Sequence, residues 1–176
     1  MLCADLLERL KVRALDPKSA TDQHLDEGWD PPFSHVASPP VTPERFAELE
    51  RELGFALPEA FQQVYTQVGD GNFGPGYGLL PLKDHRYTST SENVVVLHEQ
   101  MTEHDWSEHL LLFCYWGCDI YSVLNVNTGQ VGILGLDTCE EGTPPEEVVL
   151  WQTESLQEWL ENWLEGKDLF FDLDEP

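Results

Sequence analysis

The clearest pattern of apolar and polar positions is a pair of short amphipathic helices, the first of which begins after Thr42. Phe46, Leu49 and Leu53 recur at three- and four-residue spacing, which places them on one helical face. Thr42 can cap this helix with its hydroxyl, and a proline follows at the first helical position. Gly54 comes directly after the last apolar residue, where a left-handed backbone often ends a helix. The pattern therefore predicts a helix between Thr42 and Gly54.

The second helix of the pair is predicted between Pro58 and Gly69. Its apolar residues follow the helical spacing i, i+3, i+4, i+7 and are Phe61, Val64, Tyr65 and Val68. The loop that follows, from Gly69 to Gly74, matches the letters of the dinucleotide-binding motif G-x-G-x-x-G. That motif requires a strand before it and a helix start after it, whereas here a helix precedes the loop and Pro75 follows it. We therefore expect a tight structural loop and no bound cofactor.

Short apolar runs after this loop predict an antiparallel meander of strands. The runs cover residues 79–82, 110–115, 119–126 and 130–136. Trp116-Gly117 and Asn127-Thr128-Gly129 lie between consecutive runs and are predicted to turn the chain. Residues 92–101 are ambiguous, because three valines favour a strand while apolar positions at helical spacing after Ser91 favour a helix.

Residues 155–166 carry the most regular helical stripe in the chain. The apolar face of this stripe consists of Leu156, Trp159, Leu160, Trp163 and Leu164. Ser155 can cap the helix start, Glu158 completes a capping box three residues later, and Gly166 ends the helix. The acidic segment from Asp137 to Glu147 contains two consecutive prolines and is predicted to be a loop.

These elements divide the chain into three parts. Residues 1–40 comprise an amphipathic helix and a proline-rich connector, both expected to pack on the main domain, which covers residues 41–166. The apolar side of that first helix is formed by Leu2, Leu6, Leu10 and Leu15. Residues 167–176 form an acidic tail, which is predicted to be dispensable for folding because like charges crowd it.

The order of these elements resembles the SUKH superfamily, which includes fungal cell-wall assembly regulators and bacterial toxin-immunity proteins. The resemblance rests on Glu50 to Leu53, the Gly54-Phe55-x-Leu57-Pro58 step, the Phe61-to-Val68 helix, the glycine-rich loop, and Ser155 and Trp159. It implies an α+β fold, with an antiparallel or mixed sheet of about four to six strands and helices packed on one side. It also favours the helix for residues 92–101, and it implies a protein-binding domain rather than an enzyme.

Charge is the most unusual feature of the composition. Nine basic residues stand against 33 acidic ones, which gives a net charge of −24. No Lys or Arg occurs between Tyr87 and Gly166. Such a chain repels nucleic-acid phosphates and anionic membrane surfaces, so we expect neither as a partner. The acidity serves either general solubility or the attraction of a basic protein partner.

Candidate catalytic and metal-binding residues do not form a recognised pattern. His98, His104, His109, Cys114 and Cys118 lie close together in the sequence, yet no H-x-x-x-H or C-x-x-C pair occurs. We therefore predict no metal, no catalytic residues and no enzymatic activity. A signal-peptide pattern and an apolar run of membrane-spanning length are both missing, so we expect a cytoplasmic protein.

The candidate partner-binding residues are aromatic and acidic. Phe73, Tyr77 and Trp116 lie in predicted loops or turns beside glycine, where an aromatic side chain either folds under the loop or anchors a partner. The candidate acids are Glu140, Glu141, Glu146 and Glu147. The favoured hypothesis is an immunity protein that neutralises a basic toxin, for which a nuclease is one candidate. The alternative is a regulatory or scaffold protein of the cell-wall assembly regulator type.

Overall fold

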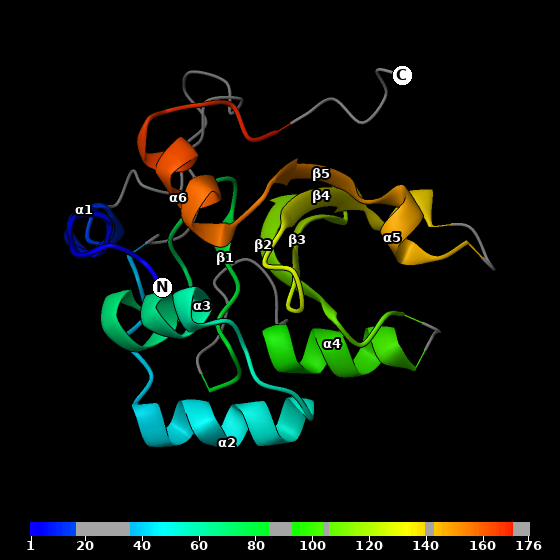
Figure 1. Cartoon of the computed structure of the whole chain (residues 1–176), viewed down its shortest axis with the longest axis horizontal. Coiled ribbons are helices and arrows are strands. Elements are labelled where there is room, and N and C mark those ends of the chain that lie inside the picture. The colour runs from blue at the N-terminus through cyan, green and yellow to red at the C-terminus, as the bar shows by residue number, and fades with distance from the viewer. Residues whose placement is uncertain (17–35, 85–92, 104–105, 140–142, 171–176) are drawn as a thin grey trace.

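The computed structural model describes residues 1–16, 36–84, 93–103, 106–139 and 143–170 (Figure 1). The helices are α1 (Ala4–Ala14), α2 (Pro43–Leu53), α3 (Glu59–Gln63), α4 (Val94–Thr102), α5 (Pro145–Val148) and α6 (Leu156–Leu164). A π-helical turn, η1 (Val64–Val68), continues α3, and a 3-10 turn, η2 (Leu136–Thr138), follows the fourth strand. The strands are β1 (Gly78–Leu79), β2 (Leu110–Gly117), β3 (Ile120–Asn125), β4 (Val131–Gly135) and β5 (Leu150–Thr153).

The strands form one antiparallel sheet in the order β1-β2-β3-β4-β5. Each strand pairs with its neighbour along the chain, so the sheet is a meander, and with the helices it gives the expected α+β fold. In Figure 1 the sheet is strongly curved, with α1, α3 and α6 gathered to its left and α2 and α4 below it. None of the described helices is long and apolar enough to cross a membrane.

The predicted helix pair is present, with the predicted ends. Thr42 accepts a hydrogen bond on Oγ1 from the backbone N–H of Arg45 at 3.2 Å, and Gly54 ends α2 with a φ of 85°. The buried face of the second helix is the predicted one, although its last turn is π-helical. Pro58 is the N-cap residue of this helix, and Glu59 is its first helical residue.

The ambiguous stretch at 92–101 is the helix α4. The Asn93 side chain caps it by accepting a hydrogen bond from the backbone N–H of Val96 at 2.9 Å, and Ser91 lies outside the described residues. Two expectations about loops and turns are wrong. The segment from Asp137 to Glu147 is not a continuous loop, because it contains part of η2 and most of α5. Trp116 and Gly117 belong to β2, and the chain turns at Cys118 and Asp119, which both have a positive φ. The fifth strand, β5, was not predicted at all.

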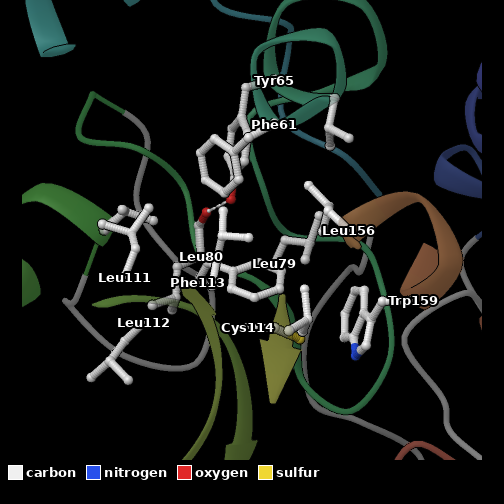
Figure 2. Packing of buried hydrophobic residues seen from close by; sticks show 14 of the residues in the cluster. Phe61, Tyr65, Leu79, Leu80, Leu111, Leu112, Phe113, Cys114, Leu156 and Trp159 are labelled. Atoms are coloured by element: carbon white, nitrogen blue, oxygen red, sulfur yellow. Dashed lines mark hydrogen bonds between the residues drawn. The ribbon is translucent and has the colours of Figure 1, made fainter. Parts of the chain in front are cut away.

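Aromatic residues from the helix pair, the sheet and α6 meet in the core (Figure 2). The Phe61 ring lies 4.5 Å from the ring of Tyr65 and 6.1 Å from that of Phe113, between ring centroids. The Phe113 and Trp159 centroids are 5.3 Å apart. The second helix of the predicted pair and α6 are therefore joined in the core through Phe113 of β2.

In α1 and in the residues just after α6, the buried side chains differ from those expected. In α1, Leu7 is buried and Leu15 is 71% exposed, so the buried face ends at Ala14. After α6, Leu169 is only 5% exposed, and its carbonyl accepts a hydrogen bond from Gln152 Nε2 at 2.8 Å. Leu169 thus packs on the folded body, while the dispensability of the tail after Lys167 stays a prediction.

Candidate protein-binding surface

The glycine-rich loop closes one edge of the sheet. The backbone N–H of Asn72 donates to the Leu79 carbonyl at 2.8 Å, and the N–H of Leu79 donates to the Phe73 carbonyl at 2.7 Å. A Cβ on Gly71, whose φ is 70°, would lie 2.7 Å from the carbonyl carbon of Leu80. The loop therefore needs glycine for its close approach to β1, and it has the structural role that its sequence context predicted.

Buried polar groups hold this loop in place. Asp70 is fully buried, and its Oδ1 accepts a hydrogen bond from the backbone N–H of Leu82 at 2.8 Å. The Tyr65 hydroxyl donates to the Leu80 carbonyl at 2.8 Å (Figure 2). Burial, together with the nearby Asp70, raises the pKa of Tyr65 well above its ordinary value, so the hydroxyl stays protonated and remains a donor.

Two of the three candidate aromatic anchors are core residues. Phe73 is completely buried, and Trp116 is 4% exposed with its Nε1 donating to Ser122 Oγ at 2.8 Å. Both therefore follow the folded-under alternative, because glycines let the backbone pack directly on the rings; a Cβ on Gly76 would lie 2.7 Å from Trp116 Cε3. Tyr77 is half-buried, with its ring 5.6 Å from that of Tyr115.

The candidate acids fall into two groups. Glu140 and Glu141 lie outside the described residues, whereas Glu146 and Glu147 lie in α5. Glu146 Oε1 is 3.2 Å from Nε2 of His109, so α5 rests against the segment that leads into β2. Glu147 is exposed.

Ser107 joins the contact between His109 and Glu146, and sequence analysis did not single it out. Its Oγ lies 3.1 Å from Nδ1 and 3.3 Å from Nε2 of the His109 ring. Its hydrogen bond to Glu146, supported by the charge of His109, lowers the pKa of that carboxyl. A hydrolase triad places serine and carboxylate on opposite nitrogens of the imidazole. Here the serine hydroxyl bonds the carboxylate directly, which is the geometry of a surface ion pair with a hydroxyl bridge.

The candidate metal ligands are dispersed. His98 is buried with its ring 5.3 Å from Phe55, and the Cys114 thiol faces the Pro75 carbonyl at 3.4 Å. Cys118 is exposed at the turn between β2 and β3. Among the described residues, which leave out His104, no three His, Cys, Asp or Glu side chains gather where they could hold a metal ion.

Two basic residues near α2, Arg45 and Lys83, form local ion pairs. Arg45 pairs with Asp84 at 2.6 Å and with Glu48 at 3.0 Å, and Lys83 pairs with Glu52. The neighbourhood of β5 differs. The exposed acids there are Glu147, Glu154 and Glu158, and none of them forms an ion pair with another described residue. The surface around α5, β5 and the start of α6 is thus strongly acidic.

The comparison with protein families agrees with this arrangement. The model for the SMI1/KNR4 family (SUKH-1) matches residues 40–162, which include the helix pair, the glycine-rich loop, the whole sheet and most of α6. The comparison with curated proteins gives no match. The matched stretch covers well over half of the chain. The chain therefore belongs to the SMI1/KNR4 (SUKH-1) family.

Proposed function

We propose that this protein is a non-enzymatic cytoplasmic binding domain that neutralises a basic toxin by holding it against the acidic surface around α5 and β5. The observation that carries the proposal is the absence of Lys and Arg between Tyr87 and Gly166, together with the exposed Glu147 and Glu154, which form no ion pair with another described residue. Toxin immunity is one of the two roles that the family resemblance implies. An acidic surface suits it because many toxins act on nucleic acids and are themselves basic.

The charge acts chiefly on the association rate. Carboxylates at the rim of an interface steer an oppositely charged partner during encounter, and salt weakens this effect. Buried apolar contacts at the centre of an interface set the dissociation rate. A surface with many exposed acids and few exposed apolar groups is therefore expected to bind fast and to depend strongly on salt.

The experiment first searches the genes next to this chain for a secreted protein with a basic C-terminal domain, and then tests co-expression and binding with that domain. We expect the full chain to restore growth of cells that express this domain. We also expect the association rate to fall at least tenfold between low salt and about 1 M salt. An acidic partner, or an association rate indifferent to salt, would contradict the proposal. Binding to proteins of cell-wall assembly instead would replace immunity with the regulatory role.

Paired double variants distinguish the effect of the acidic surface on association from the effect of net charge. Glu147→Gln combined with Glu154→Gln is expected to slow association and flatten its salt dependence. Glu44→Gln combined with Glu99→Gln changes the net charge by the same amount on exposed positions of α2 and α4. This control is expected to leave most of the association rate intact, because rim charges act within about a Debye length of the interface.

A further inference from the structure

The two edge strands of the sheet, β1 and β5, differ in the hydrogen bonds that they make beyond the sheet. On the β1 side, the glycine-rich loop bonds to both the N–H and the carbonyl of Leu79. On the β5 side, the backbone of Leu150–Thr153 bonds to β4, and its atoms make no hydrogen bond beyond the sheet to any described residue. The segment after α6 reaches β5 through the side chain of Gln152 rather than through its backbone. Among the described residues, the β1 edge is therefore closed by a loop and the β5 edge is open.

An open edge strand can accept another strand. Alternate residues of an edge strand direct their N–H and C=O groups away from the sheet, and an extended segment can pair with them. Along β5 the side chains also leave room for a partner, since Leu150 is 45% exposed and Trp151 is half-buried. An added strand would cover these two apolar side chains as well as bond the backbone.

The charge around β5 selects the kind of segment that fits. Glu147 precedes the strand by three residues and Glu154 follows it directly, and both are exposed. Glu158 lies one helical turn further on and is also exposed. A strand with Lys or Arg at alternate positions would bring its charges towards these carboxylates, whereas an acidic strand would be repelled.

We propose that β5 is the docking edge of this protein, on which an extended basic segment of a protein partner pairs as a sixth strand of the sheet. The proposal deepens the proposed function and rests on it. Backbone hydrogen bonds along β5 supply the pairing, and Leu150 and Trp151 supply the apolar contact. Glu147 and Glu154 give the preference for basic side chains at the two ends of the strand.

A second copy of this chain is a poorer occupant of the same edge. Pairing two β5 strands would bring both sets of flanking glutamates together on chains that each carry a net charge of −24. The strand is also short and its pairing with β4 contains a register shift at Val131/Gly132, features that discourage pairing between identical edges. The charge and the geometry of β5 therefore disfavour pairing with a second copy of this chain and favour a positively charged strand.

The test uses the full chain, labelled with ¹⁵N, and a blocked peptide of about eight alternating valines and lysines. We expect the amide shifts that change on titration to belong to β5 and its flanks, residues 147–154, and the outward β5 amides to exchange more slowly with solvent. A peptide with the same sequence but methylated at alternate backbone nitrogens is expected not to bind, because it lacks the donors for strand pairing. A valine-glutamate peptide is expected not to bind either.

Variants of the protein sharpen the result. Glu147→Gln with Glu154→Gln is expected to weaken the valine-lysine peptide about threefold to tenfold at low salt, while Glu44→Gln with Glu99→Gln changes its affinity less than twofold. Four outcomes would each overturn the docking edge. These are the absence of amide shifts at β5, shifts at α1 or α2 instead, equal binding of the methylated peptide, and self-association through β5. A basic ligand that binds elsewhere would leave the proposed function standing, whereas equal binding of the valine-glutamate peptide would contradict its charge basis.

Discussion

At the scale of single residues, the glycines of the loop that closes β1 are constrained by their surroundings. Gly71 has a positive φ and faces backbone atoms of Leu79 and Leu80, so a side chain there meets atoms that cannot move aside independently. Gly129, in the turn between β3 and β4, has a φ of 84° but nothing within 4 Å of an added Cβ. Gly71 is constrained by both its backbone conformation and close packing, whereas Gly129 is constrained by its backbone conformation alone.

Gly71→Ala is expected to lower the free energy of unfolding by more than about 3 kcal/mol, because left-handed strain and overpacking act together. Gly129→Ala is the matched control and is expected to cost about 1–2 kcal/mol, from conformation alone. Urea unfolding of both variants measures the difference. Equal losses would mean that the loop can move away from β1.

Protonation of His98 is expected to be linked to folding, because this side chain is buried in the folded state. Burial lowers its pKa below the ordinary value of 6.5, although a bond to the Leu110 carbonyl and the charges of Glu108 and Glu99 oppose this shift. Its Nδ1 is buried without a hydrogen-bond partner among the described residues. The unfolded chain therefore binds a proton at His98 at a higher pH than the folded chain does.

Because the folded pKa is depressed, the stabilisation from neutral His98 is present above about pH 6.5 and is lost as the pH falls below that value. We expect the free energy of unfolding to decrease between pH 7 and pH 5, and His98→Gln to remove part of this decrease. An NMR titration in which His98 gains its proton at or above pH 6.5 would contradict the assignment.

At the scale of elements, α6 and the residues after it form one packing unit. Trp159 and Trp163 face the core, and Leu169 then returns to cover Gln152 of β5. The Phe170 ring lies 5.7 Å from that of Trp116. The apolar residues after α6 thus offset the like charges around them by burial.

Leu169→Ala is expected to lower the free energy of unfolding by about 2–4 kcal/mol, the usual range for a buried leucine. Lys167→Ala, at an exposed position in the same segment, is expected to change it by less than about 0.5 kcal/mol. Thermal or urea unfolding measures both. A Leu169→Ala variant as stable as the parent chain would show that residues 168–170 are dispensable after all.

At the scale of the whole molecule, self-repulsion is the main electrostatic term. The net charge is −24, and the ion pairs near α2 and α1 neutralise only part of the surface. Raising NaCl from about 0.1 M to about 1 M shortens the screening length from about 10 Å to about 3 Å. Repulsion spread over the whole surface is then reduced more than the short ion pairs are.

We therefore expect the melting temperature to rise with NaCl over this range, as measured by circular dichroism or calorimetry. The Glu44→Gln and Glu99→Gln double variant should show a smaller rise, because it carries less charge to screen. Sucrose at matched osmolality controls for effects of solute exclusion. A melting temperature that falls with salt would mean that pairs such as Arg45 with Asp84 dominate over self-repulsion.

The sequence by itself determined α2, the helix formed by α3 and η1, and α6, because helix formation depends on contacts within a few residues. Thr42, Gly54 and Ser155 each act through the backbone groups of their own helix, and the structure confirms all three. The family and the α+β class also followed from the order of these local signals. The exposed Glu147 needed no tertiary information beyond its place in a charged segment.

The tertiary structure decided the features that depend on distant partners. Leu150 to Thr153 has strand-forming residues, yet only pairing with β4 makes it an edge strand. Its outer edge is open because no other strand of the described segments pairs with it. The burial of Phe73 and Trp116 and the docking of Leu169 likewise depend on which segments pack against them. Burial and strand pairing join residues far apart in the chain, so local patterns do not fix them.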